Sequence, residues 1–358
     1  AEVSYRASIS VDPNKVAAQN NLGTVLLDQG QLSDAVDVYR QAAGEDSVGS
    51  VHANSAWNLS LALLLSGNYE EGWRWYEWRF YKGGATPPTF NKPQWHLDAP
   101  ADARVLVWAE QGYGDAMQFV RYVPMVKARA ATVILNIHPN LRRLLDGFGG
   151  AVTVAPGEDM PEYDFHIAML SLPGLFGTTV DSVPANIPYF SVDSERMACW
   201  RERLAGDGLA IGLSWRGNPE NQNDRYRSVD PALLGPLLHV PGCRFFSLQK
   251  APAVGDWDIL ADVGLITDLG PELGDFFETA AVIEALDLVI TVDTATAHLA
   301  GGLGKRSWLM LPFIPDWRWM LDAEESPWYP SLRLFRQKEL DSWPEVIERM
   351  TVELRQGT

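Results

Sequence analysis

The sequence is poor in cysteine and has no long apolar run, and both features narrow the classes of protein it can encode. Cys199 and Cys243 are the only cysteines in 358 residues, and neither has a neighbour that would complete a metal pair. Cysteines that stay reduced, in or near the core, fit the cytoplasm better than a secreted fold. No stretch approaches the roughly 20 apolar residues that cross a bilayer, so no membrane span is predicted.

Basic residues are also scarce. The chain has 29 Lys and Arg against 46 Asp and Glu, which gives a formal net charge of −17. A nucleic-acid-binding protein normally carries a basic face, so nucleic acid is not an expected partner. A small ligand with phosphate groups remains compatible, because local groups hold such ligands. The sequence has no Cys/His cluster, Walker loop or Gly-x-Ser-x-Gly elbow, which disfavours metal, ATPase and hydrolase chemistry.

The first eighty residues contain a repeat. Tyr5 and Tyr39 lie 34 positions apart, the period of a tetratricopeptide repeat (TPR). A further copy is offset by 37 and aligns Tyr39 with Tyr76, and its three extra residues fit the polar segment GEDSVGS (residues 44–50). Each copy contains two apolar helical stripes around a turn with glycine. The pattern predicts TPR helices over residues 1–82, beginning inside the second helix of an earlier copy.

The repeats end in the aromatic run GWRWYEWRF (residues 72–80). Two repeats and a fragment cannot bury their own apolar faces, so they must pack against the domain that follows. We expect four aromatic side chains of this run to join the repeats to that domain: Trp73, Trp75, Trp78 and Phe80. Stacking of a carbohydrate on these rings is the alternative.

The rest of the chain alternates strands and helices in two rounds. Residues 83–102 are rich in glycine and proline and are predicted to be a linker. Short apolar strands then alternate with helices, first over residues 103–192 and again over residues 193–340, before a closing helix over residues 341–358. This alternation predicts two Rossmann-like lobes with parallel sheets. Ligands bind such sheets at the carboxyl ends of the strands.

The first strand-end candidate is the segment EQGYGD after strand 105–110. Gly112 and Gly114 allow a sharp turn and close approach to a ligand. Asp115 then stands at the start of a helix. There it either caps the helix, which adds about 1 kcal/mol, or acts as a general base toward an attacking hydroxyl. The residues alone leave both interpretations open.

The second candidate is TVDTATAH after strand 288–292. A helix start offers free N–H groups, and Thr294 and Thr296 add hydroxyls, which together suit a diphosphate. In the alternative interpretation, Asp293 or Thr294 caps the helix and His298 packs in the core.

Two further loops follow strands of the second lobe. One holds Arg and polar residues in a Gly/Asn/Pro context that suits phosphate oxygens, with a solvated loop as the alternative: Trp215, Arg216, Asn218, Arg225 and Arg227. The other is an aromatic loop that either shapes a sugar or acceptor pocket or packs between the lobes: Asp316, Trp317 and Arg318.

Together these motifs resemble one family, the bacterial TPR glycosyltransferases whose catalytic part is similar to the heptosyltransferases of lipopolysaccharide synthesis. The resemblance covers nearly the whole chain and includes FFSLQ, which ends at Gln249. It implies an α + α/β fold, in which TPR helices precede a metal-independent GT-B fold of two Rossmann-like lobes. No cofactor and no metal are expected, and a nucleotide-sugar is the donor substrate.

The resemblance also implies roles for individual residues. Asp115 matches the catalytic base, and the Asp-Thr-x-x-x-His motif matches the site of the nucleotide diphosphate through Asp293, Thr294 and His298. Arg225 and Arg227 match a basic loop in which the heptosyltransferases carry a lysine. We assign the nucleotide-sugar site to the following residues: Gly112, Gly114, Trp215, Arg216, Asn218, Arg225, Arg227, Gln249, Asp293, Thr294, Thr296 and His298.

Some members of the family resemble flagellin-modifying enzymes. The implied function is inverting transfer of a sugar to a hydroxyl, on Ser or Thr of a protein such as flagellin, with the TPRs binding that acceptor in the cytoplasm. Two alternatives stay open. The chain can be a transferase that builds surface glycan or lipopolysaccharide, or a TPR scaffold with an inactive transferase fold.

Overall fold

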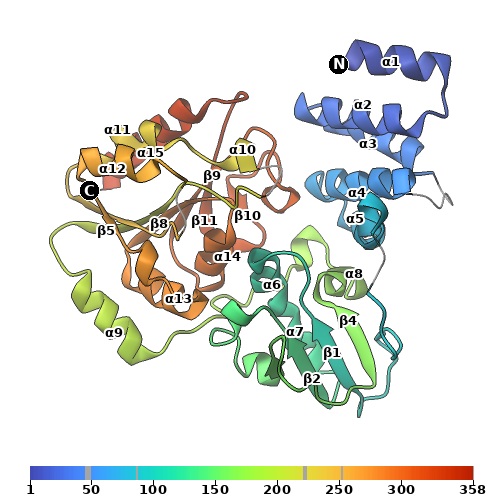
Figure 1. The fold of residues 1–358 in the computed structure, drawn as a ribbon, viewed down its shortest axis with the longest axis horizontal. Helices are drawn as coiled ribbons and strands as arrows, with labels where there is room; N and C mark the ends of the chain where they lie inside the picture. Colours follow the sequence, from blue (N-terminus) through green and yellow to red (C-terminus); the bar gives the residue numbers. More distant parts are fainter. Residues whose placement is uncertain (45–49, 86–87, 221–223, 251–252, 358) are drawn as a thin grey trace.

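The computed structural model describes residues 1–358 apart from 45–49, 86–87, 221–223, 251–252 and 358. A helical segment leads into two α/β lobes, each built on its own sheet (Figure 1). Most of the proposed repeat insertion at residues 44–50 lies outside the described residues, as do Asn221 to Asn223 of the arginine loop.

The N-terminal segment is a stack of antiparallel helices. Its elements are α1 (Glu2–Val11), α2 (Val16–Asp28), α3 (Leu32–Ala43), α4 (Ser50–Leu65) and α5 (Tyr69–Tyr76). Gly30 and Gly67 follow α2 and α4 with φ of 78° and 84°, values that a side chain rarely tolerates. The ring of Tyr39 leaves no room for a side chain at Gly23, where an added Cβ would lie 2.6 Å from the ring. The predicted repeat turns and apolar stripes are therefore present.

The aromatic run divides between two environments. Trp73 is 4% exposed, its ring centre lies 5.3 Å from that of Trp317, and its indole N–H donates to the Thr178 carbonyl at 2.9 Å. It therefore contacts both lobes, as predicted. Trp75 and Trp78 instead pack with the apolar cluster of the repeats, so the prediction was wrong for these two residues.

The first lobe has a four-stranded parallel sheet in the order β3-β2-β1-β4. Its strands are β1 (Arg104–Trp108), β2 (Thr132–Asn136), β3 (Val152–Val154) and β4 (Phe165–Ala168). The helices of this lobe are α6 (Tyr113–Phe119), α7 (Val123–Lys127) and α8 (Leu172–Leu175). β4 forms one edge of the sheet, and α8 lies beside it (Figure 1).

The second lobe has a seven-stranded sheet in the order β10-β11-β9-β8-β5-β6-β7. All pairings are parallel except that of β10 with β11. The strands are β5 (Leu209–Ser214), β6 (Cys243–Ser247), β7 (Ile266–Asp268), β8 (Leu288–Val292), β9 (Ser307–Leu311), β10 (Glu325–Ser326) and β11 (Tyr329–Arg336). The helices are α9 (Ser194–Arg203), α10 (Asp224–Arg227), α11 (Gly235–Leu238), α12 (Asp256–Val263), α13 (Phe276–Ala285), α14 (Ala295–Gly302) and α15 (Trp343–Gly357).

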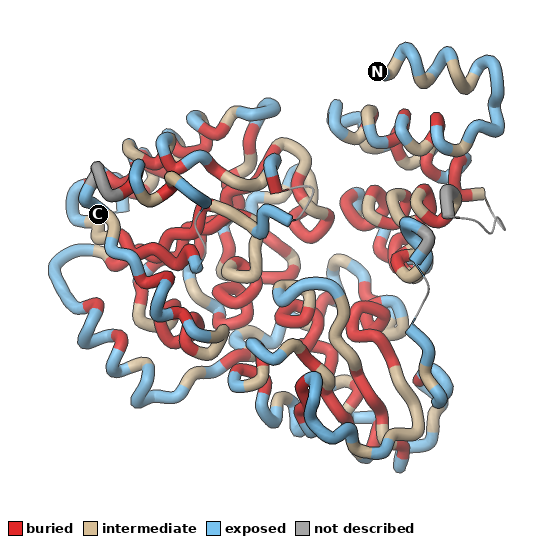
Figure 2. The backbone as a smooth tube through the Cα atoms, in the orientation of Figure 1, coloured by how far each residue is buried: buried red, intermediate tan, exposed pale blue. Residues whose placement is uncertain are grey.

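One apolar cluster runs through the final repeat helix and both lobes. It includes Tyr69 and Trp73 of α5, Val105 of β1 and Leu309 of β9. Figure 2 shows these buried segments meeting where the three parts join. Because the lobes and the last repeat share this core, their strand ends are held at fixed positions relative to one another.

Two smaller findings bear on the sequence-based expectations. Both cysteines are free thiols, but Cys199 is exposed on α9 and only Cys243 is partly buried, so core placement was wrong for Cys199. Among the described residues, no helix is both long and apolar enough to cross a bilayer.

Candidate active site between the lobes

The turn after β1 positions Asp115 at the first-lobe side of the junction. Gln111 adopts a φ of 60°, and α6 begins two residues later at Tyr113. Asp115 is therefore the third residue of the helix, and its Oδ2 accepts the N–H of Gly112 at 2.9 Å. This bond orients the carboxylate and leaves Oδ1 directed to another partner. The capping interaction is present, although Gly112 and not Asp115 occupies the N-cap position.

That partner is Arg318, which comes from the loop after β9 in the other lobe. Its Nη2 lies 2.5 Å from Oδ1 of Asp115, and its Nη1 lies 2.8 Å from Oδ1 of Asp316. Its Nε donates to the side-chain oxygen of Gln118, one turn beyond Asp115 on α6. The Arg318 side chain is only 8% exposed. Burial disfavours its charge, but Asp316 and Asp115 outweigh that effect and raise the pKa of Arg318.

The turn from β8 to α14 lies opposite. Thr294 is the N-cap of α14 and has extended backbone, so the first N–H groups of the helix are free of intrahelical partners. Thr294 and Thr296 are partly exposed. Arg227 reaches this turn and donates from Nη1 to the Asp293 carbonyl at 2.8 Å. The predicted anion-binding groups are thus gathered beside one guanidinium.

Asp293 is held in a setting that favours its neutral form. Burial and the nearby Asp316 raise its pKa to about 6, although Arg227 and Arg318 act in the opposite direction. A carboxyl with a pKa near 6 changes charge close to the physiological range. Its charge state therefore alters the field at the α14 turn.

His298 occupies the contact between the two turns. Its Nδ1 hydrogen-bonds with the Tyr329 hydroxyl at 2.9 Å, and its ring stacks near Trp319 with centres 5.6 Å apart. Burial lowers its pKa well below the usual value, and Arg318 adds to this effect, so the imidazole is neutral. A Cβ on Gly114 would lie 2.6 Å from Cδ2 of His298. Only glycine allows α6 to approach α14 this closely.

Three predicted site residues in the second lobe bind protein groups. The indole N–H of Trp215 donates to Asp256 at 3.0 Å, and Nε of Arg216 binds the same carboxylate at 2.6 Å. The side-chain oxygen of Gln249 accepts the Arg216 backbone N–H at 3.1 Å. These contacts shape the loop after β5. A direct role for these residues toward a nucleotide stays a prediction.

The arginine loop beyond them is more open. Asn218 accepts the backbone N–H of Glu220 at 3.1 Å, which is a local turn. Arg225 is exposed and lies over the ring of Tyr226, 4.5 Å from its centre. Arg227, in contrast, points to the α14 turn. Of this pair, only Arg227 is positioned beside the other predicted anion-binding groups.

The predicted pocket residues separate in the same way. Asp316 and Arg318 join the ion-pair group with Asp115, whereas Trp317 is buried against Trp73 and Phe119. Trp317 therefore packs between the repeats and the lobes, the alternative that its sequence left open.

Two residues at this junction were missed from the sequence. Gln118 and Trp319 are fully buried. Nε2 of Gln118 has no hydrogen-bond acceptor in the part of the chain that the structure describes, and the Trp319 indole lies by the Asp293 carboxyl and lowers its pKa. Gln118 lies three positions after Asp115, so it shares a helix face with it. That spacing was the available signal. Within the described ranges, no group of three or more His, Cys, Asp or Glu side chains is arranged to hold a metal ion.

Comparison with known proteins agrees with this architecture. Residues 1–50 and 20–77 match the family described as tetratricopeptide repeat. Over 74% of its length, the chain superimposes on 99% of the family 9 glycosyltransferase from Veillonella parvula, with a TM-score of 0.51 and 10% identity. ADP-heptose lipopolysaccharide heptosyltransferase II of E. coli aligns over 71% of this chain and 99% of its own, with a TM-score of 0.46 and 14% identity.

The chain therefore joins a segment that matches the tetratricopeptide-repeat family to two lobes that share the fold of the family 9 glycosyltransferase, and the predicted fold class is confirmed. A curated relative is Protein FlbA of Caulobacter vibrioides, which is 26% identical over 386 aligned positions. The alignment covers 99% of this chain and 63% of FlbA, so the chain spans somewhat under two thirds of that relative.

Proposed function

We propose that the chain is a metal-independent inverting glycosyltransferase that moves a sugar from a nucleotide-sugar to a hydroxyl of a protein. The observation that carries this proposal is the ion pair between Asp115 of the first lobe and Arg318 of the second. A carboxylate at a strand end of one sheet is held by a loop of the other, beside a helix start suited to phosphate. In this proposal residues 103–192 receive the acceptor and residues 193–340 receive the donor.

Asp115 is the base in this proposal. Each carboxylate oxygen has two lone pairs, so Oδ1 and Oδ2 can accept a further proton donor while Arg318 and Gly112 hold them in place. The acceptor O–H gives its proton to Asp115 as its oxygen bonds to the anomeric carbon of the sugar. The bond from that carbon to the phosphate oxygen breaks, and the nucleoside diphosphate leaves with the electron pair.

The leaving diphosphate needs compensation for its negative charge. The free N–H groups at the start of α14, the hydroxyls of Thr294 and Thr296, and the guanidinium of Arg227 supply it. Gln118 carries a buried N–H without a protein acceptor among the described residues, and it can donate to a sugar or phosphate oxygen at the same junction.

A protein acceptor, such as Ser or Thr of flagellin, is supported by the repeats and the family resemblance. Helical repeats present extended surfaces for polypeptides. Here they also touch the catalytic loops, because a Cβ on Gly67 would lie 3.2 Å from Met320, two residues after Arg318. Free cysteines agree with a cytoplasmic location.

The first test is a thermal-shift panel of nucleoside diphosphates and sugar nucleotides, with and without EDTA. A ligand at 100 times its Kd adds about 2.7 kcal/mol to stability, which is readily seen as a higher melting temperature. We expect one base to raise the melting temperature, with no effect of EDTA. A melt that no nucleotide shifts would overturn the transferase and favour the scaffold.

A further inference from the structure

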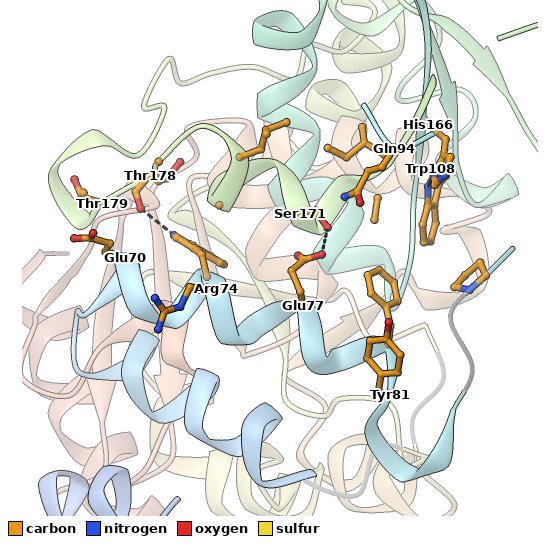
Figure 3. Close-up of a pocket in the computed structure, with 18 residues that line it drawn as sticks. Glu70, Arg74, Glu77, Tyr81, Gln94, Trp108, His166, Ser171, Thr178 and Thr179 are labelled. Carbon is orange, nitrogen blue, oxygen red and sulfur yellow. Dashed lines mark hydrogen bonds between the residues drawn. The ribbon is translucent and has the colours of Figure 1, made fainter. Parts of the chain in front are cut away.

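A cavity of about 870 Å³ lies between the last repeat helix and the first lobe, outside the junction that holds Asp115. One wall is α5 with the 3-10 turn η1 (Glu77–Phe80) that follows it, and the other is formed by β4, α8 and the residues just after α8. Figure 3 shows side chains from both walls directed into the space between them. Trp108 and Ala168 line the cavity at the carboxyl ends of β1 and β4, the edge at which parallel sheets bind ligands.

The two ends of the cavity differ in chemistry. At one end Arg74 and Glu70 are exposed beside Thr178 and Thr179. No ion pair within the described residues engages Arg74, so its charge is available to a ligand. The other end is aromatic and is lined by the following residues: Phe80, Tyr81, Trp108 and His166. An occupant that fits both ends has an acidic group at one end and a large apolar group at the other.

The centre of the cavity is rigid and connects to the catalytic turn. The Ser171 hydroxyl donates to Glu77 at 3.0 Å and accepts from Arg79 at 2.7 Å. Arg79 is buried, and the same guanidinium binds both oxygens of Glu110, at 2.7 and 2.9 Å. Glu110 stands five residues before Asp115. Hydrogen bonds through Arg79 therefore link the cavity wall to Glu110, the residue that leads into the turn with Asp115.

The backbone of β4 favours a polypeptide over other occupants. β4 is an edge strand. Among the described residues, the linker pairs with its outer side only around His166, whose backbone carbonyl accepts the Trp95 N–H at 2.8 Å and whose N–H donates to the Pro93 carbonyl at 3.1 Å. Alternate residues of a strand bond to the same side, so the next outward position is Ala168. Ala168 lines the cavity. The Ala168 carbonyl opens the 3-10 turn η6 (Met169–Ser171), so an extended peptide can continue the pairing there through the Ala168 N–H.

We infer that this cavity binds an extended segment of the acceptor polypeptide, with an acidic side chain at Arg74 and an aromatic side chain at the Tyr81 end. The inference rests on the proposed function, because it treats the neighbouring turn as the place where the acceptor hydroxyl reacts. It assigns part of acceptor recognition to the cavity between α5 and the first lobe, in addition to the surface of the repeats.

The test measures binding of short fluorescent peptides to the full chain by anisotropy. The peptides carry a central Ser, with Asp on one side and Phe on the other at varied spacing. A matched set has Lys in place of Asp. We expect the wild type to bind the Asp set, Arg74→Glu to weaken that binding by about tenfold or more, and Arg74→Glu to prefer the Lys set. Tyr81→Ala should weaken both sets through loss of apolar contact.

Two exposed positions away from the cavity provide matched controls. Arg201→Glu on α9 makes the same charge change, and Leu340→Ala removes an apolar side chain that is 58% exposed. Neither should alter peptide binding. Equal binding of the Asp set by the wild type and Arg74→Glu, or no binding to the wild type, overturns the inference even if nucleotides shift the melt. Peptide binding without any nucleotide shift overturns the acceptor assignment and the proposed function together.

Discussion

The turns after β1 and β8 both lead from a strand into a helix, but they present different groups to a ligand. The turn after β1 offers a carboxylate, fixed by Gly112 on its own side and by Arg318 from across the junction. The turn after β8 offers N–H groups, hydroxyls and the nearby Arg227. In the proposed function the first turn removes a proton and the second holds an anion. Two turns of similar backbone are thus distinguished by the side chains that follow each strand.

The largest expected effect is on kcat, which should depend on the turn after β1 and not on nucleotide binding at the turn after β8. Asp115→Asn removes the base while keeping the side-chain shape, so we expect kcat to fall about 10²- to 10⁴-fold. The nucleotide-induced thermal shift should stay close to that of the wild type. Asp164→Asn, which disrupts an ion pair with Arg104 at the opposite end of β1, is the matched control and should retain turnover. Unchanged turnover in Asp115→Asn would remove the distinction between the two turns.

The second expected effect is on the affinity for the nucleoside diphosphate, which should depend on the turn after β8. Arg227→Ala removes the guanidinium beside the α14 turn, and a hydrogen bond to a charged group is worth about 1.5–3 kcal/mol. We expect the Kd for the nucleoside diphosphate to rise about 10- to 100-fold in calorimetric titration. Arg333→Ala, at a surface pair with Glu353, should leave the Kd unchanged. An unaltered Kd in Arg227→Ala would exclude this arginine from the anion site.

The third effect tests the contact between the turns. Gly114→Ala forces a methyl group against His298, and overpacking of this kind costs about 1–3 kcal/mol. We expect a lower melting temperature and reduced kcat, because α6 and α14 must move apart. Gly235→Ala adds the same group where no atom lies within 4 Å, so it should be nearly neutral. If both variants behave alike, the close approach has no importance for function.

The smallest expected effect concerns pH. Burial and Asp316 raise the pKa of Asp293 to about 6, above its value of about 3.9 in the unfolded chain. The folded state therefore binds this proton more tightly, and the resulting stabilisation is full below about pH 3.9 and is lost as the pH rises through about 6. We expect the melting temperature of Asp293→Asn to rise relative to that of the wild type as the pH increases from about 4.5 to 7. Exposed Asp207→Asn is the control, and parallel curves for wild type and Asp293→Asn would contradict the shift.

Local patterns predicted the repeats and the principal strands. The 37-residue offset between copies aligned Gly30 with Gly67 and so identified the repeat turns, and both glycines adopt a backbone conformation that favours glycine. Apolar runs located β1 and β8 and therefore the turns after them. The strands β7 and β10 were missed because they are short and mostly exposed, so neither contains an apolar run.

Contacts between distant segments could not be read from the sequence. Asp115 and Arg318 are separated by 203 positions, and the sequence around each residue does not indicate that the other is its partner. Trp73 and Trp75 lie two positions apart on α5 and therefore face different sides of it, but nothing local says which side meets the lobes. The cavity at α5 depends on two elements far apart in the chain, so it also had no local signal.

Trp73 has a consequence for any attempt to divide the chain. Its ring packs among aromatic residues of both lobes, and its indole N–H satisfies a carbonyl of the first lobe. A shortened protein that begins after residue 82 would uncover this apolar surface and leave the Thr178 carbonyl without that donor. Such a fragment should aggregate when expressed alone, and mixing it with the separate repeat segment should restore solubility. The repeats would then keep the two lobes soluble by covering this surface from within the same polypeptide.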